Sequence, residues 1–179
     1  RDSHKSVDEK PSGGGPGMVL RADVIDTAIN NCFKKNRPLI YFSPKGKPLN
    51  QDTIEKFSLT KGVSIICGHF EGIDQRIIDL HDIEEISIGD YILSGGEIAT
   101  IVFLDSLVRL LPDVLGNDNS KKIETFTDGL LEYPQYTKPN EFKGMKIPDI
   151  LLSGNHKAIK EWQENQALSL TKLRRPDLI

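Results

Sequence analysis

The stretch from Glu85 to Glu97 reads Glu-Ile-Ser-Ile-Gly-Asp-Tyr-Ile-Leu-Ser-Gly-Gly-Glu, and the rest of the chain is organised around it. Its first four residues predict a short strand, because β-branched side chains stand at alternate positions. Gly89-Asp90 and Ser94-Gly95-Gly96 then break the chain twice before a helix opens at Glu97. Glycines at such breaks let another group approach bare backbone, which is typical of a pocket that binds its ligand through main-chain groups. Two ordinary turns of an α/β domain are the alternative.

Length and composition predict a soluble globular protein. The chain has 179 residues, of which 27% are charged and 37% hydrophobic, enough for one main domain and a small second one. It contains no apolar run of about 18 residues and no signal sequence, so we expect a cytoplasmic protein without a membrane span. The net charge of −3 argues against a general polyanion binder but permits a local basic patch. The two cysteines lack CxxC spacing and the four histidines are scattered, so neither a disulfide framework nor a metal site is expected.

The first half of the chain alternates helices with apolar runs. Pro11 to Met18 is rich in glycine and predicts a loop, either a linker or a loop shaped for a ligand. Asp23 is a plausible N-cap for an amphipathic helix that ends near Lys35. Leu39 to Phe42 predicts a buried strand, after which Lys45 to Pro48 turns away, and Gln51 to Leu59 predicts a short helix.

Val63 to Cys67 repeats this pattern of a buried strand followed by a loop. With the strand at residues 85–88 it makes three strands that alternate with helices, which indicates an α/β layered domain. Ligands of such domains lie beyond the carboxyl ends of the strands. We therefore expect the loops after Phe42, Cys67 and Ile88 to converge.

The second half begins with a helix that is apolar around most of its circumference, from Glu97 to Leu111. Such a helix should be buried on more than one side, and a second subunit is one way to bury it. Asp113 to Thr127 predicts a mobile polar linker. The remainder predicts a smaller helical unit, with basic residues concentrated on and just after a helix from His156 to Leu170.

Six motifs occur here in the same order as in bacterial tRNA (guanine-N1)-methyltransferases, and the chain resembles that family from Val7 to its end. The motifs are Gly13-Gly14-Gly15-Pro16-Gly17-Met18, Tyr41-Phe42-Ser43-Pro44, Cys67-Gly68-His69-Phe70-Glu71-Gly72-Ile73-Asp74, Ser87 to Glu97, Leu152-Ser153-Gly154-Asn155-His156 and Arg174-Arg175-Pro176.

The resemblance implies a SPOUT-type α/β methyltransferase with a trefoil knot in its parallel sheet and a small C-terminal helical domain. It also implies a homodimer with its active site at the subunit interface, S-adenosylmethionine as methyl donor and guanosine 37 of tRNA, beside the anticodon, as acceptor. The residue pattern alone predicts an unknotted doubly wound sheet, because knots are very rare.

The same resemblance divides the chain into three parts. Residues 1–115 correspond to the knotted donor-binding domain, 116–125 to a flexible linker and 126–179 to a helical tRNA-binding domain. The family's short N-terminal strand has no counterpart before Arg1, so we expect the sheet to lack it.

The family's donor pocket falls on the three loops expected to converge. The sulfonium and amino groups of the donor favour a nearby acid, and Glu71 is the candidate for this role. A surface salt bridge is the alternative role of Glu71. The implied donor-binding residues are Tyr41, Phe42, Ser43, Pro44, Gly68, Phe70, Glu71, Ser87, Ile88, Gly89, Tyr91, Leu93, Gly95 and Gly96.

Methylation of guanine N1 requires removal of the N1 proton and stabilisation of negative charge that moves toward O6. Arg109 matches the family's catalytic arginine, and Glu124 stands where the family usually has an aspartate base. One additional methylene displaces the carboxylate by about 1 Å, which requires a compensating path of the chain. Asp118 is the other carboxylate considered for this role. The implied tRNA-binding residues are Pro16, Gly17, Ser120, Lys157 and Arg174.

Two other functions remain open from the sequence. A knotted methyltransferase that acts on another RNA would share the donor loops. A non-catalytic RNA-binding protein would need only the basic C-terminal helix.

Overall fold

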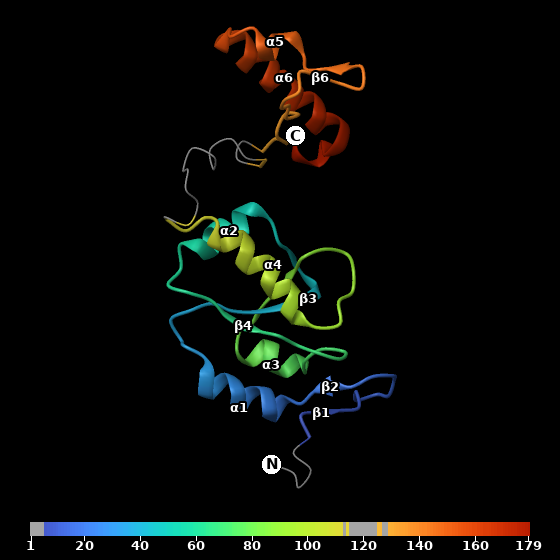
Figure 1. Ribbon diagram of the computed structural model, residues 1–179. Coiled ribbons are helices and arrows are strands. Elements are labelled where there is room, and N and C mark those ends of the chain that lie inside the picture. The colour runs from blue at the N-terminus through green and yellow to red at the C-terminus, as the bar shows by residue number, and fades with distance from the viewer. Residues whose placement is uncertain (1–5, 113, 115–124, 127–128) are drawn as a thin grey trace. The chain divides into compact units, whose positions relative to one another are not determined.

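The computed structural model of the chain describes residues 6–112, 114, 125, 126 and 129–179 (Figure 1). The chain forms two compact units, Arg1–Val114 and Leu115–Ile179. Most of the predicted polar linker falls outside the described residues, as do the predicted site residues Ser120 and Glu124 and the other carboxylate considered, Asp118.

The first unit is built on a sheet of three parallel strands, which confirms the predicted α/β fold with a parallel sheet. The strands are β3 (Leu39–Pro48), β4 (Ser64–Ile66) and β5 (Glu84–Ser87), in the order β4-β3-β5. In the centre of the sheet, Ile40 pairs with Ile65 on one side and with Glu84 on the other. The carboxyl ends of the three strands therefore lie at the same edge.

Alternate residues of β3 enter two separate cores, one on each face of the sheet. Ile40 and Phe42 pack against α2 (Gln51–Ser58) and α4 (Gly96–Val108). Leu39 and Tyr41 belong to the other core, with residues of α1 (Ala22–Cys32) and α3 (Gln75–Leu80). Figure 1 shows α2 and α4 on one side of the strands and α1 and α3 on the other. Burial on both faces explains why the strands read as continuous apolar runs.

The predicted turn at Lys45 to Pro48 is wrong, because β3 resumes its pairing there. Phe42 and Lys47 both pair with Ile86, and the chain leaves the partner strand between them. Such an excursion depends on the position of β5 and has no local sequence signal. It places Ser43 and Pro44 beside the edge where the strands end.

The N-terminal residues form a hairpin rather than a linker. β1 (Asp8–Glu9) pairs with β2 (Val19–Leu20) in antiparallel fashion, and the glycine-rich loop connects them. The main chain of this hairpin is bonded to the segment after β4, since Met18 O accepts from Glu71 N at 2.9 Å and Leu20 N donates to Gly72 O at 2.9 Å.

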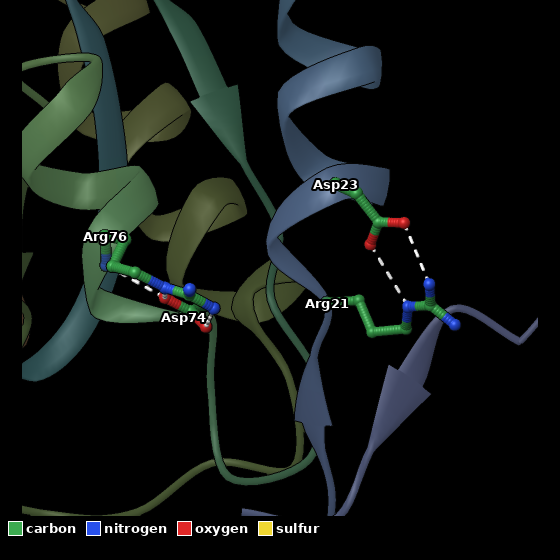
Figure 2. A network of polar contacts seen from close by, with 4 residues as sticks. All are labelled: Arg21, Asp23, Asp74 and Arg76. Carbon is green, nitrogen blue, oxygen red and sulfur yellow. Dashed lines mark hydrogen bonds and ion pairs between the residues drawn. The ribbon is translucent and has the colours of Figure 1, made fainter. Parts of the chain in front are cut away.

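Asp23 is not the N-cap of the first helix, because α1 begins at Ala22 and Arg21 holds the extended cap position. The Asp23 carboxylate instead accepts hydrogen bonds from the Arg21 guanidinium at 3.1 and 2.8 Å (Figure 2). Asp74 forms the corresponding pair with Arg76 and also caps α3 by accepting from the Arg76 N–H. The helix α3 was not predicted from the sequence.

The second unit contains a hairpin and two helices. Strand β6 (Glu141–Phe142) pairs with β7 (Met145–Lys146), and α5 (Asp149–Leu152) precedes the long helix α6 (His156–Arg174), which ends in the turn η2 (Pro176–Leu178). The hydroxyl of Thr171 on α6 is fully buried and accepts a hydrogen bond from Leu131 N at 2.9 Å. This bond fixes the segment before the hairpin against α6, which extends beyond its predicted end at Leu170.

Phe103 should be the most sensitive position of the first core. Its side chain is fully buried, and its ring centroid lies 5.8 Å from that of Phe42 and 5.3 Å from that of Phe57. We expect Phe103→Ala to lower the free energy of unfolding of this unit by about 3 to 5 kcal/mol, because it leaves a cavity in a close-packed core. Hydrogen exchange of the β3 amides measures this loss.

Leu59→Ala is the matched control, since Leu59 is 87% exposed at the end of α2. A loss for Phe103→Ala no larger than that for Leu59→Ala would contradict this description of the core.

Candidate active site

A cavity of about 330 Å³ lies at the carboxyl ends of the three parallel strands. Its walls are the segments after β3, β4 and β5, so the predicted convergence of three loops is confirmed. Each of the fourteen residues predicted to bind the donor lines this cavity: Tyr41, Phe42, Ser43, Pro44, Gly68, Phe70, Glu71, Ser87, Ile88, Gly89, Tyr91, Leu93, Gly95 and Gly96.

The segment after β4 closes around the side chain of Tyr41. A Cβ atom at Gly68 would lie 2.6 Å from the Tyr41 ring, so only glycine permits this contact. Burial raises the pKa of the Tyr41 phenol, and the nearby Glu85 carboxylate raises it further. The phenol therefore remains protonated and neutral at physiological pH.

The segment after β5 is an irregular loop that is fixed by local hydrogen bonds. The Ser87 hydroxyl bonds to both the N–H and the C=O of Gly89 at 3.2 Å, and the Tyr91 hydroxyl donates to Ile88 O at 3.0 Å. Tyr91 and Ile92 are 54% and 82% exposed. This loop therefore presents apolar side chains at the cavity mouth.

The segments after β4 and β5 cross where α4 begins. Gly96 N donates to Gly68 O at 3.0 Å, and His69 pairs with Gly95 in an isolated bridge. A Cβ atom at Gly96 would lie 3.0 Å from Cys67 Cα, at the limit of real contacts. The crossing is thus a contact between two backbones, and it joins two walls of the cavity.

A histidine–carboxylate pair lies at the same crossing. His69 Nε2 is 2.5 Å from Glu97 Oε1, although 28 residues separate them in the sequence. The hydrogen bond from His69 lowers the pKa of the Glu97 carboxyl. Both side chains are about half exposed, so solvent screens their interaction.

Glu71 and the N-terminal hairpin lie next to each other. Glu71 is exposed on the cavity wall, and a Cβ atom at Gly17 would overlap its side chain. Of the residues predicted to contact tRNA, Gly17 therefore lies next to a residue of the cavity wall. Pro16, Lys157 and Arg174 are all exposed, and the last two lie on α6, at its second and last residues.

Arg109, the predicted catalytic arginine, is not among the residues that line the cavity. It follows the last residue of α4, whose first residue, Gly96, lies at the cavity. At about 1.5 Å per residue, these two backbone positions are about 20 Å apart. The structure therefore does not bring Arg109 to this cavity within one chain, and Glu124 lies outside the described residues.

The model of the family described as tRNA (Guanine-1)-methyltransferase TrmD matches residues 1–179. The chain belongs to this family. Three similar proteins are each named tRNA (guanine-N(1)-)-methyltransferase. They come from Bartonella henselae (54% identical over 99% of this chain and 76% of the relative), Pelagibacter ubique (52%, over 99% and 78%) and Ehrlichia canis (53%, over 99% and 77%).

Several residues line the cavity although the sequence of this TrmD family member did not predict them as donor-binding residues. His69 lies inside the motif Cys67 to Asp74, and Gln75 follows it directly. Their position in this motif was the only sequence signal that they line the cavity. Ile73 and Ile78 enter the wall around the start of α3, a helix that could have been found from Asp74 as N-cap before two adjacent isoleucines. Among the described helices, none is long and apolar enough to cross a membrane.

The pair at the crossing makes a pH-dependent prediction. We expect His69→Phe to return the pKa of Glu97 toward the ordinary value of a glutamate, because the lowering hydrogen bond is lost. In the wild type, a lowered folded-state pKa contributes stability above the unfolded-state pKa, and this stability is lost as the pH falls through the folded-state value. NMR titration of the Glu97 carboxyl carbon measures the change.

His81→Phe is the control, since His81 bonds to Asp26 at 2.7 Å on the other side of the sheet. An unchanged Glu97 titration in His69→Phe would show that the pair does not form in solution.

Proposed function

We propose that this chain transfers a methyl group from S-adenosylmethionine to N1 of guanosine 37 in tRNA, next to the anticodon. Membership of the TrmD family over residues 1–179 supports the reaction. The observation that carries the proposal is the single cavity at the strand ends, which all fourteen residues of the family's donor pocket line. The proposal also takes the cytoplasm as the place of action, because tRNA is found there.

The residues of the cavity fit the proposed donor. Its volume of about 330 Å³ lies within the range of small-molecule pockets. Apolar side chains such as Phe42 and Leu93 can flank an adenine, while exposed main-chain groups of the glycine segments can bind its edge. The Glu71 carboxylate can balance positive charge on the donor. When bound, S-adenosylmethionine supplies an electrophilic methyl group attached to a sulfonium centre.

Two side chains would act on the guanine. Glu124 would accept the N1 proton as the new N–CH₃ bond forms, and the charged guanidinium of Arg109 would stabilise negative charge that moves toward O6. Proton removal leaves the N1 lone pair available for the methyl group. Asp118 is the alternative base.

The position of Arg109 favours an active site made by two subunits. Because Arg109 is about 20 Å along α4 from the cavity of its own chain, an arginine near the acceptor would come from a second copy. The surface of α4 also suits such a partner. Five apolar side chains on it are at least 40% exposed: Ile98, Ile101, Val102, Leu104 and Val108.

The remaining parts of the proposal concern topology and the second unit. We infer a trefoil knot in the first unit, which the tight crossing of Gly96 and Gly68 would accommodate. We assign tRNA binding to the second unit, where α6 carries Lys172 and Arg174 in its last turn.

A methylation assay tests the reaction and its position. We expect the chain to form 1-methylguanosine in a tRNA transcript at position 37, and to form none when guanosine 37 is replaced by adenosine. Nuclease digestion and mass spectrometry locate the methyl group. Methylation of another nucleotide would favour a different RNA methyltransferase, and donor or tRNA binding without any transfer would favour a non-catalytic RNA-binding protein.

Subunit mixing tests the two-subunit site. Arg109→Ala and Glu124→Gln homodimers should each lose about 10²-fold or more in single-turnover rate, the usual scale for loss of an acid–base group. We expect Arg109 and Glu124 of one site to come from different subunits. A heterodimer of one chain of each kind should then regain activity, because one of its two sites would contain both native residues.

Differently tagged chains allow the heterodimer to be purified, and the two homodimers are its controls. Heterodimer activity no higher than that of either homodimer would exclude a shared site, and a fully active Glu124→Gln homodimer would direct attention to Asp118.

A further inference from the structure

The hairpin of the second unit has a tight turn with an unusual residue in it. Phe142 pairs with Met145, so Lys143 and Gly144 alone form the turn (Figure 1). Their φ angles are 51° and 81°, as in the type I′ turn that joins two strands most tightly. Asparagine or glycine is preferred at the first of these positions, whereas lysine is strained there. A strained residue at an exposed turn indicates a function other than stability.

The same turn presents apolar side chains to solvent. Phe142 and Met145 are 56% and 69% exposed. Because they are directly paired, their side chains project from the same face of the hairpin. The hairpin therefore holds a flat aromatic ring and a flexible thioether next to each other at the surface of the second unit.

One cation adjoins this apolar pair. The Lys143 ammonium lies 5.4 Å from the centre of the Phe142 ring, whereas Lys146 is on the other face of the hairpin and 3.8 Å from the Glu141 carboxylate. Residues 138–146 contain three lysines and one acidic residue in a chain of net charge −3. An exposed aromatic ring beside a cation suits an unpaired nucleotide, whose base stacks on the ring while a phosphate meets the lysine.

We propose that this hairpin, residues 141–146, is a binding site for an unpaired nucleotide of tRNA. Phe142 stacks on the base, and Lys143 lies beside an adjacent phosphate. This inference rests on the proposed function, because it takes tRNA as the partner, and it adds a contact apart from the basic residues of α6. Aromatic residues and methionine also occur at the centres of protein interfaces, but lysine is depleted there, so Lys143 beside the ring favours the nucleotide.

Phe142→Ala tests the stacking contact in the full chain. We expect it to weaken binding of an unmodified tRNA transcript by about 5- to 100-fold, the range for loss of one stacked base. Phe142→Trp should retain the affinity, because it keeps an aromatic face. Ile179→Ala is the matched control, since Ile179 is an apolar residue of the same unit that is 58% exposed. Calorimetric binding of S-adenosylmethionine should be unchanged in all three variants.

Lys143→Gly separates binding from folding. Glycine relieves the strain at a φ of 51°, so the melting temperature should stay the same or rise. The tRNA affinity should nevertheless fall, and the slope of log affinity against log salt should decrease by about one.

Three results would overturn the inference. In the first, the Phe142→Ala variant binds tRNA with an affinity within twofold of that of the wild type, and the wild type methylates tRNA. This result would leave the proposed function intact. The second is a loss of affinity that accompanies dissociation of the dimer in sedimentation, which would make the hairpin a protein contact. The third is wild type that neither binds nor methylates tRNA, in which case the proposed function itself fails.

Discussion

The crossing of Gly96 over Cys67 and Gly68 is the constraint on which the rest of the first unit depends. The two backbones approach so closely that a Cβ atom at Gly96 would lie 3.0 Å from Cys67 Cα, and the Gly96 N–H donates to Gly68 O. This contact fixes where α4 begins, and through Ala99 and Phe103 it fixes the helix against the sheet. It also joins the segments after β4 and β5, which form two walls of the cavity. Where these two walls meet, the pocket is lined by Gly68, Gly95 and Gly96, which have no side chains.

The third wall of the cavity follows β3, and this central strand contacts both sides of the same crossing. β3 sends Tyr41 against Gly68 on one face of the sheet and Phe42 against Phe103 on the other. The backbone excursion after Phe42 carries Ser43 and Pro44 to the cavity before the strand pairs with Ile86 again. The residues that line the cavity are therefore supported by both cores, while Arg109 is not among them.

The sequence was sufficient for features whose physics is local or repetitive. Leu39 to Phe42 and Val63 to Cys67 are apolar runs of the kind that parallel sheets bury on both faces, and parallel strands necessarily bring the loops that follow them to one edge. Features set by distant contacts could not be predicted. The return of β3 at Lys47 depends on where β5 lies, and His69 meets Glu97 because two loops cross. The pairing of Asp8 and Glu9 in β1 has no periodic pattern, because a strand of two residues is too short to show one. The strained Lys143 lies in a turn that none of the six motifs covers.

The central claim is that the three segments at the strand ends form one donor pocket within a single chain. Hydrogen exchange with and without S-adenosylmethionine tests it directly, because bound ligand slows exchange of the amides that it covers. The account predicts that protection is concentrated in residues 41–45, 68–73 and 87–96, with little change in α6. The claim would be contradicted if protection were confined to the second unit. It would also be contradicted if a saturating concentration of S-adenosylmethionine protected only one of the three segments.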